Sequence, residues 1–228
     1  MTPSSIAALF GAGIAAVVLL GLADSRRRRA REGFIESYRF PPGVRQRVGK
    51  RYPHLSEEQL DLVFVALREY FHLCRKARRR LLAMPSQVVD VAWHEFILFT
   101  RNYGDFCRRG LGHFLHHTPT EAMANRTMAT DGIKRTWRLA CLREGIDPKV
   151  ALSVPLLFAI DRQLGIEDGF HYVLNCTHMM AAANSNSFCA SHIGCGSGCG
   201  GGCAGSGCGA DGGGGDGGGD GGCGGGGD

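Results

Sequence analysis

Several signals are missing from this 228-residue sequence, and each absence excludes a class of protein. Alternating apolar and polar residues and two-residue hairpin turns are lacking, which argues against a β-sheet fold. His94-Glu95 is followed by Phe96, Ile97 and Leu98, so the HExxH motif of the common helical zinc hydrolases is absent. Outside the last 35 residues the glycine content is ordinary. The body of the chain is therefore predicted to be one helical, globular domain.

Signals for nucleic-acid binding are also absent, because basic residues are not interleaved with aromatics and no known module is present. The net charge of +5 divides into +9 for residues 1–193 and −4 for residues 194–228, which contain no Lys or Arg. Most basic residues are arginines, as is typical of GC-rich bacterial genomes. One basic group ends a predicted helix, where cations complement the helix dipole: Arg75, Lys76, Arg78, Arg79 and Arg80. We expect no nucleic-acid partner.

The N-terminus carries a long apolar run. Residues Ile6–Ala23 contain no charge, and as a helix they would extend roughly 27 Å, close to the ~30 Å of a hydrocarbon core. Arg26–Arg29 and Arg31 follow the run, whereas a signal peptide has its basic residues before it. The sequence therefore predicts a single-pass anchor in the cell membrane, with the N-terminus outside and the rest cytoplasmic. A cleaved signal peptide is the alternative.

The predicted anchor with its basic flank occupies residues 1–31, and a connector broken by Pro41-Pro42-Gly43 occupies residues 32–54. A helical domain follows over residues 55–187. It opens on a capping box from Ser56 to Gln59, and apolar residues recur at the helical period as far as Leu81. In this first helix His72 lies among basic residues and is expected to be solvated, whereas Cys74 lies on the apolar stripe as an inert core thiol.

The next predicted helix, from Gln87 to about Arg109, is apolar nearly all round and belongs in the centre of a bundle. Its polar residues make one narrow stripe: Asp90, His94, Arg101 and Asp105. Further helices are expected over residues 120–144, from Asp147-Pro148 onward, over 156–164 and, more weakly, over 170–183. The predicted fold is all-α.

Histidines gather around the end of this second helix. His94 lies one turn after Asp90, so the carboxylate can accept the ring N–H, as in the outer shell of metal sites. Cys107 lies about 140° away from His94 on the same helix and would share a metal only if other segments folded back. The candidate ligands of a metal, with zinc as the candidate ion, are His94, Cys107, His113, His116 and His117. Two structural interpretations compete: a solvated helix face, and loop histidines that bond free backbone ends.

The segment Met84–Pro119 resembles the defining stretch of the glycine-rich domain-containing protein family. The matching residues are Asp90, Trp93, His94, Leu98, Tyr103 and Cys107, with His116 or His117 before a proline-containing turn. Phe96 and Thr100 stand where the family motif has a second histidine and a proline. The resemblance implies a helical domain joined to a glycine-rich region, without a settled activity, in which Asp90, Trp93, His94, Tyr103 and Cys107 form one site or one buried network.

The C-terminal tail, residues 188–228, is rich in glycine and cysteine and has few apolar side chains, so disorder is expected. Because cytoplasmic thiols stay reduced, no disulfide framework is predicted. The tail thiols are Cys189, Cys195, Cys199, Cys203, Cys208 and Cys223. Their spacing permits capture of zinc, copper(I) or an iron–sulfur cluster. It is also similar to the cores of azole-modified peptide precursors.

Three functions follow as hypotheses. The first is a non-enzymatic, membrane-anchored cytoplasmic helical module that binds a protein partner or assembles through its tail. The second is a metal-binding protein or metal-dependent enzyme that uses Asp90, His94, Cys107 and the His113–His117 segment. The third is the precursor of a modified Gly/Cys-rich peptide.

Overall fold

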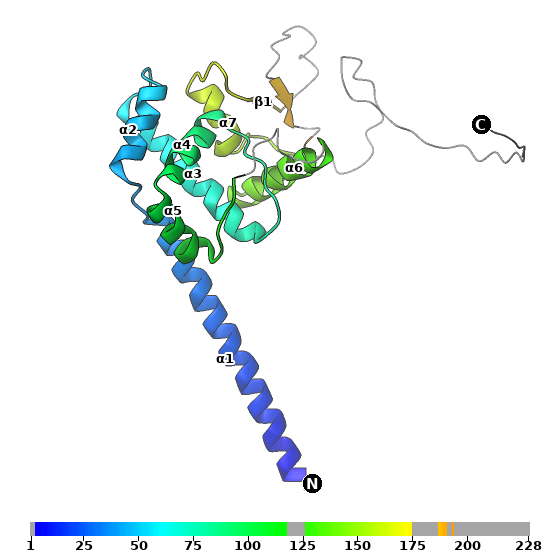
Figure 1. The fold of residues 1–228 in the computed structure, drawn as a ribbon. Helices are drawn as coiled ribbons and strands as arrows, with labels where there is room; N and C mark the ends of the chain where they lie inside the picture. Colours follow the sequence, from blue (N-terminus) through cyan, green and yellow to red (C-terminus); the bar gives the residue numbers. More distant parts are fainter. Residues whose placement is uncertain (1–2, 118–125, 175–186, 191–192, 194–228) are drawn as a thin grey trace, which may run out of the picture. The chain divides into compact units, whose positions relative to one another are not determined.

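The structure is a computed structural model that describes residues 3–117, 126–174, 187–190 and 193. All of them belong to the first of two units, residues 1–196. This part of the chain is mostly helical (Figure 1), which confirms the all-α prediction. Its elements are α1 (Pro3–Glu36), α2 (Pro42–Arg51), α3 (Glu57–Ala77), α4 (Gln87–Leu98), α5 (Thr100–Phe106), the π-helix η1 (Cys107–Leu111), α6 (Arg126–Arg143), α7 (Leu156–Gln163), β1 (His171–Val173) and β2 (Ser187–Cys189).

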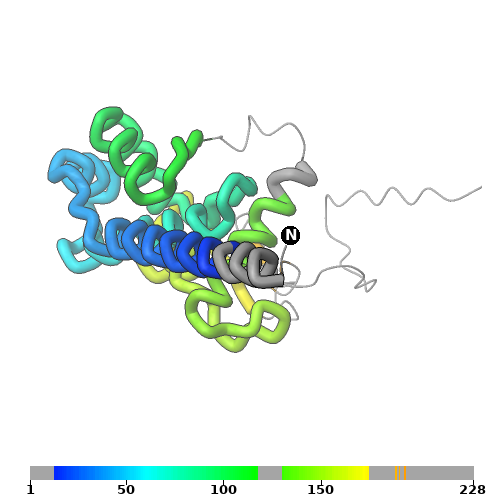
Figure 2. The backbone as a smooth tube through the Cα atoms, turned by 90° about the horizontal axis from the view of Figure 1, so that it is seen from below, coloured from blue at the N-terminus to red at the C-terminus, as the bar shows by residue number. Residues whose placement is uncertain are grey.

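Helix α3 is the element around which the others pack. It begins with the predicted capping box: the Gln59 backbone N–H donates to Ser56 Oγ at 3.2 Å, and the Ser56 N–H donates to Gln59 Oε1 at 2.9 Å. Its apolar stripe is buried, and it contacts α1, α2, α4, α6 and α7. Figure 2 shows the chain from below, with α1 in blue in the foreground. Cys74 is buried here, which raises the pKa of its thiol to about 12 and makes it unreactive.

The helix predicted over Gln87–Arg109 is interrupted. Helix α4 ends at Leu98, and Phe99 leaves the helical conformation with φ −84° and ψ 61°. The Phe99 ring lies against Gly43 of α2, so closely that a Cβ at Gly43 would clash with it. The break in the helix is therefore accompanied by tertiary packing of the Phe99 ring. The predicted single polar stripe is wrong, because Arg101 and Asp105 lie on α5, whereas Asp90 and His94 lie on α4.

Other predicted boundaries also change. The segment predicted as a connector contains α2 and the end of α1, and it buries Ile35, Val44 and Val48 completely. Asp147-Pro148 does not open a helix; instead Asp147 Oδ1 accepts a hydrogen bond from the Lys149 N–H at 2.9 Å in a local turn. Helix α7 confirms the helix predicted over 156–164. The helix predicted over 120–144 is confirmed from Arg126, and residues 118–125 lie outside the described residues.

A short parallel strand pair replaces the predicted last helix where that segment is described. Strand β1 pairs with β2 in the register His171 with Ser187. The predicted disordered tail, from residue 188, therefore overlaps β2, and Ala190 is buried. Residues 175–186 and 194–228, with five of the six tail cysteines, lie outside the described residues.

Helix α1 contains the predicted anchor. Its described side chains begin at Gly13 and are exposed as far as Arg31. Among the residues that the structure describes, no helix has the length and apolar character needed to cross a membrane. The prediction of a transmembrane span is thus unsupported there.

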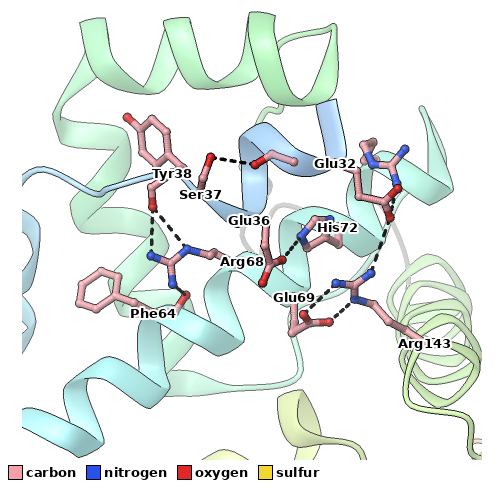
Figure 3. A network of polar contacts seen from close by, with 11 residues as sticks. Glu32, Glu36, Ser37, Tyr38, Phe64, Arg68, Glu69, His72 and Arg143 are labelled. Carbon is pink, nitrogen blue, oxygen red and sulfur yellow. Dashed lines mark hydrogen bonds and ion pairs between the residues drawn. The ribbon is translucent and has the colours of Figure 1, made fainter. Parts of the chain in front are cut away.

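The C-terminal end of α1 docks onto α3 through a polar network (Figure 3). Glu36 contacts His72 Nε2 at 3.0 Å, and Glu32 pairs with Arg75 at 3.0 Å. Arg143 of α6 pairs with Glu69 of α3. His72 is only 2% exposed, so the prediction of a solvated histidine is wrong, because the end of α1 covers this face of α3. The network joins three helices around one buried imidazole.

The buried His72 predicts a pH-dependent stability. Burial lowers the pKa of the imidazole below its ordinary value; Arg143 lowers it further, while Glu36 and Glu69 oppose the shift. The unfolded chain therefore takes up this proton at a higher pH than the folded chain, and stability falls as the pH drops below ~6.5. We expect His72→Leu to show a shallower loss of unfolding free energy between pH 7.5 and 5.5, measured by urea denaturation. The exposed His116→Leu should keep the wild-type slope, and equal slopes for all three proteins would contradict the assignment.

Candidate metal centre

The start of α4 is fixed by a buried carboxylate from α7. Asp161 is 1% exposed and accepts hydrogen bonds from Ser86 Oγ at 2.7 Å and from the Gln87 and Val88 N–H groups at 2.7 and 3.2 Å. It also accepts one from the Phe170 N–H at 2.9 Å. These donors include the free N–H groups of the first turn of α4, where a negative charge also suits the helix dipole. Asp161 therefore sets the position of the helix that carries Asp90 and His94.

Asp90 lies between two imidazoles. Its Oδ2 is 3.2 Å from His94 Nδ1, and its Oδ1 is 3.1 Å from His117 Nε2. His94 Nδ1 also lies 3.0 Å from the Asp90 backbone oxygen, one turn back on α4. The two rings are 4.0 Å apart between centroids. One ligand atom from each of the three residues lies within 4.8 Å of the other two, so a single ion could contact all of them.

His117 reaches α4 because a buried network holds the segment before it. Tyr103 OH donates to the Leu115 backbone oxygen and accepts a hydrogen bond from Trp93 Nε1 at 3.2 Å. The Trp93 ring also packs edge-on against His117, with centroids 4.6 Å apart. Trp93 and Tyr103 are both nearly completely buried. These two residues position His117 rather than bind an ion themselves.

The three clustered side chains line a cleft of about 1020 Å³, which residues 78–82 and 113–117 also line. Their side chains are partly open to it: 14% of His117, 25% of Asp90 and 49% of His94 is exposed. Structural zinc sites are closed by four protein ligands, whereas catalytic sites have three and leave a position for water or substrate. An ion held here would have three protein ligands and an open position, as in a catalytic site.

The remaining predicted ligands lie elsewhere. Cys107 is 1% exposed, in contact with Tyr103, and burial raises the pKa of its thiol. It is not part of the cluster, so its role in the described structure is packing beneath the 112–117 segment. His113 and His116 line the cleft without joining the cluster. Of the tail thiols, Cys189 lies in β2, but its side chain, like the other five cysteines, is outside the described residues.

A second group with metal-ligand chemistry, Glu36, Glu69 and His72, is the docking network of α1. Both oxygens of Glu69 are engaged by Arg143, and the His72 side chain is only 1% exposed. The Arg143 guanidinium therefore already supplies the positive charge that a metal ion would otherwise bring to this group. No comparable cation pairs with Asp90 among the described residues, so the Asp90 cluster is the better metal candidate.

Sequence reasoning brought Asp90, His94 and His117 together but missed Asp161. Periodicity marks Asp161 as one polar residue on a short helix, and its four donors lie 9 to 75 residues away. The one local sequence signal for this contact was Ser86. It caps the N-terminus of α4 by accepting a hydrogen bond from the Val89 N–H, and its hydroxyl also donates to Asp161.

Comparison with known proteins corrects the family assignment. A family model described as UCP032817-like matches residues 30–193. The resemblance to the glycine-rich domain-containing family, based on residues 84–119, is therefore wrong. The curated proteins and the solved structures give no match. The matched region contains the helices from the end of α1 to α7 and the whole Asp90 cluster. The chain belongs to the uncharacterised UCP032817-like family.

Proposed function

We propose that the helical domain binds a divalent transition metal, with zinc as the first candidate, through Asp90, His94 and His117. The observation that carries the proposal is the convergence of one ligand atom from each residue within 4.8 Å at the wall of a cleft. The ion would be presented to a small molecule in that cleft, which makes a metal-dependent enzyme the functional class that the geometry supports best.

The distances suit such an ion. Two ligands that each lie ~2.1 Å from zinc at a tetrahedral angle are about 3.4 Å apart, close to the 3.1 Å between Asp90 Oδ1 and His117 Nε2. His94 Nδ1 can donate to the Asp90 backbone oxygen, which orients the ring and leaves Nε2 as the basic nitrogen. A bound zinc ion would supply Lewis acidity and lower the pKa of a coordinated water.

The test compares two neighbouring histidines. Co²⁺ and Zn²⁺ binding is measured on the full chain and on His117→Ala and His116→Ala variants. Removal of a ligand should weaken the affinity of the site by more than about a hundredfold, the upper range for loss of an outer-shell partner. His116→Ala removes the same side chain from the same segment and should retain wild-type affinity. The tail cysteines are common to every variant, so any metal they hold cancels in the comparison.

Two outcomes would contradict the proposal. Wild-type affinity in His117→Ala, with the fold intact by circular dichroism, would show that the cluster is a structural polar network. Equal losses in the two histidine variants would show that the bound metal does not depend on the triad.

We infer a second function, membrane attachment through α1, from its exposed apolar side chains. Large apolar residues are more than half exposed along this helix: Ile14, Val17, Val18, Leu19, Leu20 and Leu22. Together with the apolar residues before them and the arginines after them, they fit a single-pass anchor whose domain and tail face the cytoplasm. Protein partners or assembly through the tail would then be confined to the membrane surface.

This attachment predicts flotation with lipid. The full chain should rise with liposomes in a density gradient at neutral pH, even in high salt. A Val17→Arg/Leu20→Arg variant should stay at the bottom, because charges at mid-helix strongly oppose insertion. The matched control, Leu98→Arg/Leu152→Arg, alters two exposed apolar residues of the helical domain and should still float. Failure of the wild type to float would exclude the attachment.

A further inference from the structure

The cleft that contains the Asp90 cluster is also lined by three consecutive arginines. Arg78, Arg79 and Arg80 follow the end of α3, and their side chains are exposed where the chain passes the cleft. Asp90 is the only carboxylate among the described residues that line it. Within this cleft the arginines outnumber the carboxylates three to one, although the same arginines also line a second cavity that contains Asp24, Glu32 and Asp131. A divalent ion on Asp90 would make the cleft more positive still.

The arginines are not used by the rest of the described structure. Arg79 and Arg80 make no side-chain hydrogen bond or ion pair with any described residue, and Arg78 has only the nearby charge of Asp24. Some other arginines on the domain are paired, as Arg143 is with Glu69 and Arg45 with Glu57, whereas Arg101 has no ion pair with a described residue. Guanidinium groups left without a protein partner beside a cleft retain all their donors for an external anion.

The backbone at the start of this arginine segment has an unusual conformation. Arg78 has φ 59° and ψ −115°, and it is the only described residue other than glycine with a positive φ. Such a conformation persists in a bulky residue only where the surroundings impose it. The segment that follows is held: Leu82 O accepts from Tyr70 OH at 3.3 Å, and Ala83 O accepts from Thr136 Oγ1 at 2.8 Å. The arginines thus stand on a fixed turn rather than on a free loop.

We propose that the cleft binds a small molecule carrying a phosphate group, held by Arg78–Arg80 together with the metal on Asp90, His94 and His117. This inference rests on the metal centre proposed above. A phosphate dianion offers three acceptor oxygens, enough for an ion and more than one guanidinium at once, whereas a carboxylate offers two. The aromatic rings of Phe114, Phe170 and Tyr70 also line the cleft and would receive the organic part of the molecule.

The test uses the full chain in detergent, loaded with Co²⁺, and inorganic phosphate as the probe. Phosphate should change the visible absorption of the bound Co²⁺ in a saturable way and broaden its own ³¹P signal. Arg79→Gln/Arg80→Gln should bind Co²⁺ as the wild type does but require at least about tenfold more phosphate, because each lost charge-assisted hydrogen bond costs a factor of this order. The matched control, Arg101→Gln/Arg108→Gln, changes two exposed arginines that do not line the cleft and should bind phosphate normally.

The outcomes separate the two proposals. If Co²⁺ binds through the triad but phosphate has no effect, the phosphate inference fails and the metal centre stands. If acetate produces the same change at the same concentration, the cleft takes carboxylates and the inference is overturned. If the triad binds no metal, the proposed function fails. If the ³¹P signal of phosphate broadens equally with and without added metal, phosphate binds to the arginines alone, which contradicts the joint site proposed here.

Discussion

Replacing Asp161 by alanine should lower the free energy of unfolding by roughly 3–5 kcal/mol. The carboxylate is 1% exposed and accepts four hydrogen bonds, from Ser86, Gln87, Val88 and Phe170. Alanine would leave these donors unsatisfied at or near a buried position, and each such donor costs ~1–3 kcal/mol, less whatever water can enter. It would also remove the negative charge at the start of α4. Urea denaturation at neutral pH measures the difference.

A second aspartate provides the comparison. Asp147 accepts one hydrogen bond, from the Lys149 N–H, on the exposed surface. Asp147→Ala should therefore cost no more than about 1 kcal/mol. If the two variants were equally stable, Asp161 would not be the residue that fixes α4. Because α4 carries Asp90 and His94, Asp161→Ala should also weaken metal binding under conditions where the protein is still folded.

Replacing Trp93 by alanine should have the other large effect, a loss of about 3–5 kcal/mol of stability together with the loss of metal binding. The indole is 3% exposed and packs against Tyr70 with ring centroids 5.2 Å apart. It also donates to Tyr103 OH and supports the His117 ring. The variant would empty part of the core and release the segment that brings His117 to Asp90.

Trp137→Ala separates these two consequences. Trp137 is 1% exposed, packs on Phe158 and donates to the Pro148 backbone oxygen, so its removal should cost a similar amount of stability. It does not line the cleft, and Co²⁺ titration at low temperature should give near wild-type affinity. If both tryptophan variants lost metal binding equally, the loss would reflect general unfolding and not the support of His117.

Much of the fold was accessible from local sequence signals. Ser56 and Gln59 form their predicted capping box, and the 3.6-residue period of α3 matches its buried stripe. The 90–94 spacing correctly predicted the contact between Asp90 and His94, because both residues lie one turn apart on the same helix. These features depend only on residues close together in the chain.

The errors concern contacts between distant residues. Periodicity cannot show that Phe99 leaves the helix to pack on Gly43, or that the end of α1 buries His72. Nor can it show that His117, rather than Cys107, reaches Asp90, since this depends on the Tyr103 bond to Leu115. Residues 171–173 form a strand because they pair with residues 187–189, a partner too distant for a local pattern to predict.

The position of His117 would couple the proposed metal binding to folding. Twenty-seven residues separate it from Asp90, and α5 and η1 lie between them, so the unfolded chain has no preformed triad. An ion that binds only the folded chain stabilises it by about 2.7 kcal/mol at a concentration one hundred times its dissociation constant. The melting temperature of the domain would then rise with the free metal concentration, and the thermal lifetime of the protein in a cell would depend on the local supply of that ion.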